Sequence, residues 1–361
     1  MTLVLWRYIS LRFFTNIVGA FALLGLLIFM VDFIEVLRSA GKFGGGSMAT
    51  LVAITALRLP AYAELTLPFA VLVGTIASFL GLSRSSELIV IRAAGVSVWQ
   101  FIVPGLLVGG LFGALSVGVY NPLAAQARAS ADELRAETFK RSNSLLKTKA
   151  GSWLRQDSPD GQSIISAKAT ARGGQVLAGV TVLQYNRQHQ FTERIEAARA
   201  ELFDGYWQLS DALVARVGEP VREHDVYLIA TYLTGEQVTN ALGSVISISI
   251  WDLPKRIELA EKAGLSSVRY SVQFEQLLAR PALLMAMVLL GATVSLRAFR
   301  FGKIQTLVVI GLTAGFGFFI FAEMSRQVGL SGLVSAGSAA WVPILLASCL
   351  SVTALLYQED G

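Results

Sequence analysis

Long uncharged apolar runs divide this chain and predict six membrane-spanning helices. About 20 consecutive apolar residues cross the hydrocarbon core of a bilayer. Three such runs precede a polar middle section and three follow it. The predicted spans are residues 13–31, 65–82, a stretch within 96–125, 277–296, 304–322 and 341–357.

The section between the third and fourth spans follows a different pattern. Ala127–Arg141 is charged and helix-prone and extends the third span, whereas residues 144–250 alternate β-rich runs with turn signals such as Asp204-Gly205. Short strands at this spacing, without helices between them, indicate an all-β sandwich or roll. Clear runs are 152–155, 162–167, 176–185, 206–217 and 245–250, and a short amphipathic helix is expected over 252–262.

These patterns predict an α-helical membrane protein with an inserted all-β domain. The transmembrane helices are arranged as three before the domain and three after it. The expected divisions are residues 1–125, 126–275 and 276–361.

A short polar segment, Leu82–Ser97, separates the second and third spans and indicates an amphipathic helix on a membrane face. Ser83 or Ser85 is expected to cap its start. Glu87 lies in the first turn, where the helix dipole favours a carboxylate, and Gly95 is expected to end the helix.

The apolar residues Leu88 and Ile91 of this segment fall on one helix face at i, i+3 spacing. The segment is therefore either a plain connector between two spans or a docking surface for another protein.

Glycines recur every four residues at Gly105, Gly109 and Gly113, and again at Gly311 and Gly315. Small residues at this spacing let two membrane helices approach closely. Packing within the chain is the favoured interpretation of the first stripe, and a subunit interface is the alternative.

Composition supports the membrane assignment. Hydrophobic residues make up 54% of the 361 positions, mean hydropathy is +0.58 and only 15% of residues are charged, whereas soluble domains carry about 25%. The one cysteine, Cys349, excludes a disulfide framework within the chain. The net charge of +5 is mild and does not indicate nucleic-acid binding.

The Lys and Arg residues of the short loops predict the orientation. Seven lie on one side and four on the other, which favours the first side as cytoplasmic. Both termini and the 82–97 segment are then inside, and the β domain is outside, in the periplasm of a two-membrane bacterium. The first side carries Arg7, Arg12, Arg84, Arg92, Arg297, Arg300 and Lys303, and the other Arg38, Lys42, Arg58 and Arg326.

No catalytic, metal or cofactor signature is present in the sequence. Walker A, Gly-x-Ser-x-Gly and His-Glu-x-x-His patterns are absent, and His189 and His224 lack cysteine partners. Ionisable residues at span edges are instead candidates for anchoring or for binding an anionic lipid. They are Asp32, Glu35, Arg38, Arg58, Glu64, Arg280, Glu323 and Arg326.

The motif Arg-Ser-Ser-Glu-Leu-Ile-Val-Ile-Arg-Ala-Ala-Gly at 84–95, with Val31-Asp32, Ala40-Gly41, Pro60 and Leu67-Pro68, resembles the lipopolysaccharide-export permeases of the LptF/LptG (YjgP/YjgQ) family. The resemblance covers essentially the whole chain, and the LptG branch is the nearer one.

This resemblance implies an inner-membrane subunit that pairs with a paralogous permease and binds a cytoplasmic ATPase dimer through a coupling helix at 84–95. Lipopolysaccharide would enter a cavity lined by the first and fifth spans of both permeases. A jellyroll-like periplasmic domain would then pass it to a single-span jellyroll subunit and a bridge protein. No cofactor is implied.

The resemblance also implies roles for individual residues. Some family members carry lysines before the Val-Asp pair and after the proline, where this chain has Phe29, Met30 and Ala61. The expected docking residues are Arg84, Glu87, Leu88, Ile91, Arg92 and Gly95. The expected lipid contacts are Asp32, Arg38, Lys42, Arg58, Phe316 and Arg326.

Two other classes of function fit parts of the pattern. A mechanotransmitting permease of the FtsX/MacB kind moves no lipid but has four spans. A membrane anchor that presents a periplasmic β domain needs neither a docking helix nor charges at the span edges.

Overall fold

The computed structural model of the chain describes residues 3–43, 46–138, 147–148, 151–158, 161–171, 174–186, 188, 190–216, 218–233, 248–262, 266–298 and 304–360. The chain divides into two compact units. The helical unit comprises Met1–Glu35, Arg58–Ala124 and Val272–Gly361, and the β unit comprises Val36–Leu57 and Ala125–Ser271.

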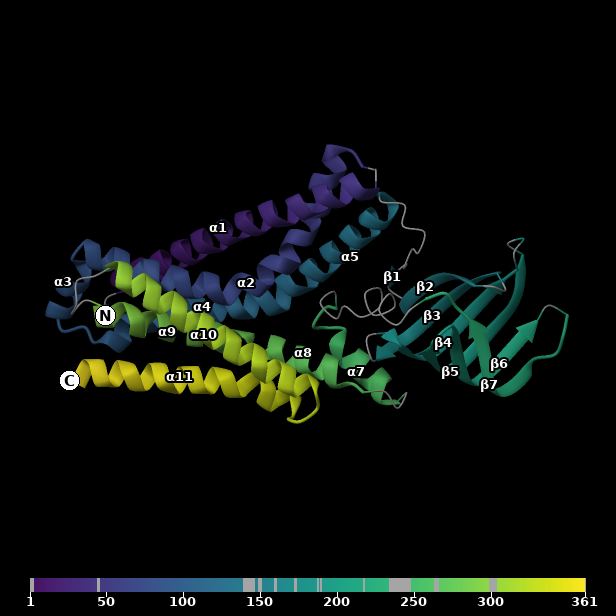
Figure 1. Ribbon diagram of the computed structural model, residues 1–361. Helices are drawn as coiled ribbons and strands as arrows, with labels where there is room; N and C mark the ends of the chain where they lie inside the picture. Colours follow the sequence, from purple (N-terminus) through teal and green to yellow (C-terminus); the bar gives the residue numbers. More distant parts are fainter. Residues whose placement is uncertain are drawn as a thin grey trace. The chain divides into compact units, whose positions relative to one another are not determined.

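Long helices flank the β-strands in the sequence (Figure 1). Before the strands come α1 (Leu3–Phe43), α2 (Met48–Arg84), α3 (Glu87–Ala93), α4 (Val98–Leu115), the π-helical turn η1 (Ser116–Tyr120) and α5 (Asn121–Thr138). After the strands come α7 (Leu253–Lys262), α8 (Val268–Leu278), α9 (Arg280–Ala298), α10 (Ile304–Leu330) and α11 (Ala336–Asp360).

Five helical stretches in the described part of the chain are long and apolar enough to cross a membrane. They are Leu3–Gly41, Met48–Arg84, Val98–Asp132, Val309–Leu330 and Ala336–Gln358. The pair α8 and α9, bent by 52°, makes six if it counts as one span. The predicted helical membrane protein with an inserted all-β domain is therefore confirmed.

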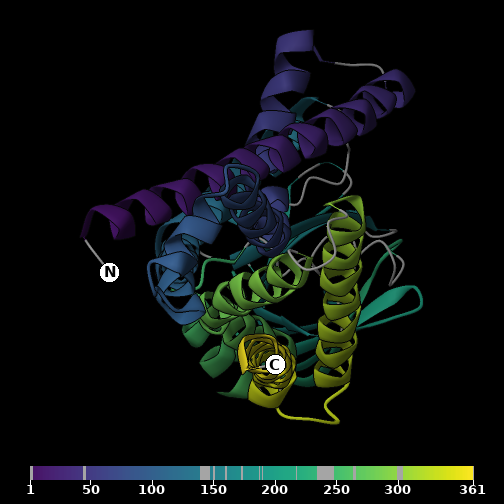
Figure 2. The ribbon, with the colours of Figure 1, turned by 90° about the vertical axis from the view of Figure 1, so that its left-hand side faces the viewer.

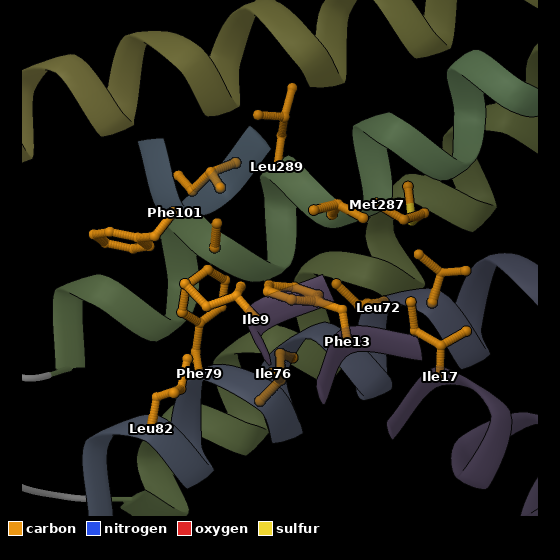
Figure 3. Packing of buried hydrophobic residues seen from close by; sticks show 14 of the residues in the cluster. Ile9, Phe13, Ile17, Leu72, Ile76, Phe79, Leu82, Phe101, Met287 and Leu289 are labelled. Atoms are coloured by element: carbon orange, nitrogen blue, oxygen red, sulfur yellow. The ribbon is translucent and has the colours of Figure 1, made fainter. Parts of the chain in front are cut away.

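Aromatic rings from three helices meet in the core of the helical unit (Figure 3). Phe79 of α2 contacts Phe13 of α1 and Phe101 of α4 edge to face, with ring centroids 5.4 and 6.0 Å apart. This arrangement of aromatic rings is favourable beyond the burial of apolar area. α4 also contacts α9, which α10 and α11 contact in turn (Figure 2).

The glycine stripe of α4 lies within this core. A Cβ at Gly105 would lie 2.7 Å from the ring of Phe13, and one at Gly109 would lie 3.0 Å from Val288 of α9. At Gly113 a Cβ would collide with the backbone of Pro281. The interpretation as packing within the chain is confirmed, because a Cβ would clash at Gly105 and Gly113 and would be tightly packed at Gly109.

The described residues of the β unit form a seven-stranded antiparallel sheet in which each strand pairs with its sequence neighbour. The strands are β1 (Lys147–Thr148), β2 (Gly151–Ser158), β3 (Gly161–Ala171), β4 (Val176–Tyr185), β5 (Phe191–Phe203), β6 (Tyr206–Arg216) and β7 (Arg222–Ala230). Of the predicted run 245–250, residues 245–247 lie outside the described residues, and Ile250 begins a turn.

The sheet rolls over so that strands far apart in its order touch. Gln156 of β2 is buried and accepts hydrogen bonds from Trp207 Nε1 of β6 (3.1 Å) and from Thr231 Oγ1 after β7 (2.7 Å). Its own amide donates to the carbonyl of Ala230 (3.4 Å). These bonds satisfy a polar side chain inside an apolar interior, where an unpaired one would be costly.

A crease crosses the described strands at one register row. From β3 to β7, each strand contributes one residue to this row: Lys168, Gly179, Ala198, Asp211 and Asp225. The residues on either side of the row pair across the sheet, but these five do not pair with one another. Gly179 and Asp211 have left-handed backbones, with φ of 58° and 54°. The carbonyl of Lys168 accepts a bond from Arg256 Nη1 of α7 (3.0 Å).

The buried face changes parity at the crease. In β6, Trp207 and Leu209 are buried before it, and Ala212 and Val214 after it. A residue with a left-handed backbone interrupts the alternation of inward and outward side chains along a strand. The apolar side chains of both halves of the strand can therefore point into the same interior.

Candidate functional site

The helix α3 is the centre of the predicted docking segment, and its ends differ in part from prediction. α2 runs to Arg84, and α3 begins after Ser86, whose φ is 57° and whose side chain makes no cap. The expected Ser83 or Ser85 cap was wrong, because Ser85 Oγ bonds back to the carbonyl of Gly81 (2.9 Å). Gly95 (φ 79°) ends the helix as predicted.

The apolar face predicted from the sequence exists, but it points into the chain. Leu88 and Ile91 are 2% and 8% exposed and belong to the core of the helical unit. They therefore cannot fill a partner's groove directly, which corrects that expectation. The exposed apolar residues of α3 are Ile89 and Val90, at 62% and 67%.

Charged and small residues surround this exposed pair. Arg84, Arg92 and Gly95 are all exposed, whereas Glu87 is half-buried. The exposed surface of α3 is therefore apolar in the middle, and it lies between Arg84 at the end of α2 and Arg92 in the last turn of α3.

The carboxylate of Glu87 is held by the first helix. It accepts bonds from Arg12 Nη1 (3.1 Å) and Tyr8 Oη (2.8 Å). A hydrogen bond from Ser85, followed by those from Tyr8 and Arg12 and by the charge of Arg12, lowers the pKa of Glu87. The group is thus ionised at neutral pH.

Two expected lipid contacts neutralise each other inside the protein. Asp32 Oδ1 of α1 lies 3.1 Å from Arg58 Nη1 of α2, and both side chains are less than a tenth exposed. Arg58 Nη2 also donates to Tyr62 Oη (2.5 Å), and its guanidinium lies over the Tyr62 ring. This pair is presented to the interior rather than to lipid, which corrects the expectation for Asp32 and Arg58.

The other expected lipid contacts lie on two helices. Arg38 is exposed on α1, and Lys42 follows one turn later, although its side chain is outside the described part. On α10, Phe316 is 58% exposed. Arg326 forms a two-bond pair with Glu323, at 2.8 and 2.6 Å, so its charge is partly satisfied within α10.

The first and fifth predicted spans have the largest unpacked apolar surfaces. In the most apolar window of α1 17% of residues are buried, and in that of α10 11%, compared with 56% in α2. Both helices therefore expose long apolar faces to a membrane or to another chain.

A sequence profile described as "Lipopolysaccharide export system permease LptF/LptG" matches residues 7–357. The chain belongs to the LptF/LptG family. It is 24% identical over 345 residues to the lipopolysaccharide export system permease protein LptG of Escherichia coli K12, covering 92% of this chain and 93% of that protein. The LptG of Haemophilus influenzae is 23% identical over 355 residues, with 94% of both chains covered.

Membership of the LptF/LptG family makes this a multi-pass membrane protein of a transport family rather than of an enzyme family. Both relatives carry the name LptG, which agrees with the branch expected from the motif. His189 lies outside the described residues, and the His224 ring lies tilted beside that of Tyr227 on β7, with centroids 5.6 Å apart.

The sequence interpretation missed how polar residues join three helices of this LptF/LptG chain. Glu64 of α2 pairs with Arg280 of α9 and accepts a bond from Asn121 Nδ2 (3.0 Å) at the start of α5. Tyr120 Oη donates to the carbonyl of Pro60 (3.1 Å) nearby. The signal in the sequence was the closeness of two prolines, Pro60 and Pro281, to the charged Glu64 and Arg280 of otherwise apolar spans.

Proposed function

We propose that this chain is the LptG-like permease subunit of an ATP-driven exporter that extracts lipopolysaccharide from the bacterial inner membrane. The match to the LptF/LptG family over nearly the whole chain carries the proposal. The exposed apolar faces of α1 and α10 support it, because a lipid cavity between two permeases needs apolar walls that are not filled by the chain's own core.

The proposal includes the partners that such a machine requires. A paralogous permease would complete the cavity, and a cytoplasmic ATPase dimer would supply the energy. A single-span periplasmic jellyroll subunit and a bridge protein would receive the lipid from the β domain. The ATPase-docking surface around α3 would consist of Arg84, Glu87, Arg92 and Gly95, together with the exposed Ile89 and Val90.

The proposed orientation places both termini and α3 in the cytoplasm and the β domain in the periplasm. The functional parts would be residues 1–125, 126–275 and 276–361. Lipid phosphates would meet the exposed Arg38, with Lys42 one turn away on the same helix. Phe316 would contact acyl chains from α10.

Five or six apolar helices in the described part exceed the four of an FtsX/MacB-like permease.

Site-specific photocrosslinking tests this function. A photoreactive residue at Arg38 or Phe316 should trap lipopolysaccharide in cells, and the adduct should decrease when ATP hydrolysis by the complex is active. Leu350 of α11 is 70% exposed and serves as a control for general lipid contact. Adducts at neither test position, or equal adducts at all three, would contradict the lipid-cavity proposal.

A further inference from the structure

Three polar residues of α1 form a stripe that faces α2 and α3. Tyr8, Arg12 and Asn16 are spaced by four residues, which places them one above another on a helix. Tyr8 and Arg12 bond Glu87 at the start of α3, and Asn16 Nδ2 donates to Ser78 Oγ of α2 (3.0 Å). The stripe ties the N-terminal half of α1 to both neighbouring helices.

The Arg12 side chain passes close to a glycine of α2. A Cβ at Gly81 of α2 would lie 2.7 Å from Arg12 Nη2. Arg12 therefore passes α2 beside a residue that has no side chain, and it bonds Glu87 beyond it. Arg12 Nη1 also donates to Tyr8 Oη (2.7 Å), so the three side chains close a triangle of hydrogen bonds.

The apolar side of α3 is attached to the same half of α1. Leu88 and Ile91 share one buried cluster with Ile9 and Phe13, which follow Tyr8 and Arg12 by one residue each. Ile9, Phe13 and Leu82 are seen in this cluster in Figure 3. Polar bonds and apolar packing thus connect α3 to the start of the first span.

We propose that Arg12 is a positioning residue that transmits movement of α3 to the first span. Its bond to Glu87 makes α3 and the N-terminal half of α1 move as one body. When a docked ATPase shifts α3, α1 shifts with it and changes the apolar wall that α1 contributes. The Glu87 side chain remains 34% exposed, so a cation of the partner can approach it while Arg12 is bound.

This inference rests on the proposed function, and its test separates the two. The complete complex of both permeases and the ATPase is reconstituted in vesicles that contain lipopolysaccharide. Three quantities are measured: co-purification of the ATPase, ATP hydrolysis, and lipid released to a periplasmic acceptor per ATP. If the complex with the natural chain releases no lipid on ATP addition, the proposed function fails, whatever Arg12 does.

With Arg12→Ala we expect the ATPase to remain bound and active while lipid released per ATP falls by about fivefold or more, the scale of a typical coupling between sites. Arg12→Lys keeps the charge and should recover part of the coupling. Arg7→Ala removes an exposed arginine from the same helix end and should change nothing. A purely structural role for Arg12 would instead reduce assembly, binding and hydrolysis together.

Two results would overturn the inference while the function stands. One is an unchanged ratio of lipid to ATP in Arg12→Ala. The other is an equal fall in the lipid released per ATP in Arg12→Ala and in Arg7→Ala. If Arg12→Ala does not assemble, Tyr8→Phe takes its place, because it removes one bond of the triangle with little change in shape. An unchanged lipid-to-ATP ratio in Tyr8→Phe, together with a complete loss of lipid release in Arg12→Lys, would also overturn the inference.

Discussion

Asp32 on α1 and Arg58 on α2 form an ion pair of 3.1 Å in which both side chains are almost completely buried. Removing one partner of a buried pair leaves the other charge without compensation. Asp32→Ala should therefore destabilise the chain by about 3–5 kcal/mol. Thermal unfolding of the detergent-solubilised protein measures this.

The double variant Asp32→Leu with Arg58→Met removes both charges and fills the space. It should recover most of the lost stability, since an apolar replacement of a buried pair is often neutral. A double variant less stable than either single variant would show that the two residues do not act as a pair.

Docking on α3 should depend on Glu87 and on the exposed apolar pair rather than on Leu88 and Ile91. Glu87→Arg and Val90→Asp should each abolish or strongly reduce co-purification of the ATPase while the chain remains folded, because Val90 is exposed. Leu88→Ala should instead lower the unfolding temperature, because Leu88 is buried in the core. Unchanged co-purification with Glu87→Arg would refute the docking role.

The pH dependence of this contact follows from the Glu87 carboxylate. Its pKa in the folded chain lies below the ordinary value of 4.5 because Ser85, Tyr8 and Arg12 stabilise the charged form. The stabilising contacts are complete above the ordinary value and are lost only as pH falls through the lower folded value. The pair with Arg12 should therefore persist from neutral pH down to about 5.

Comparison of the natural chain with Glu87→Gln between about pH 5 and 8 checks this, since other titrating groups affect both proteins alike. The difference in ATPase co-purification between the two should be constant over that range. A difference that disappears near neutral pH would mean that Glu87 titrates there and that its carboxylate is not held as described.

Asp211 occupies a left-handed backbone position on the crease, which suits Asn, Asp or Gly but not a β-branched residue. Asp211→Val should destabilise the β unit by about 1–2 kcal/mol, and Asp211→Asn should be nearly neutral. Hydrogen exchange of the β6 amides measures the local effect. Equal protection in both variants would argue against a left-handed requirement at this position.

Sequence pattern predicted the features that depend on local composition. Apolar run length indicated the spans, and the spacing of Gly105, Gly109 and Gly113 indicated close helix packing, because both properties are contained in a few consecutive turns. The same local information located α3 and its apolar face. It did not reveal whether Leu88 and Ile91 meet a partner or the chain's own core, since that depends on residues far away, such as Ile9 and Phe101.

The strand β5 shows a second limit. Residues 191–203 are rich in Glu, Arg and Ala, which favour helices when isolated. The alternation that marks a strand changes parity at Ala198, so neither half is long enough to give a clear period of two. The ion pair of Asp32 and Arg58 was missed for a related reason, because each residue alone resembles an interfacial anchor.

The crease also constrains how the β domain can vary among relatives. In β4, β5 and β6 the alternation of buried and exposed residues shifts at the same row. An insertion of one residue between the crease and a strand end would therefore expose the buried side chains of the outer part of that strand and bury its exposed ones. Insertions of two residues, or changes confined to the turns, would preserve the interior. Length differences in this domain should therefore lie in its turns, and those between a strand end and the row through Gly179 and Asp211 should come in steps of two residues.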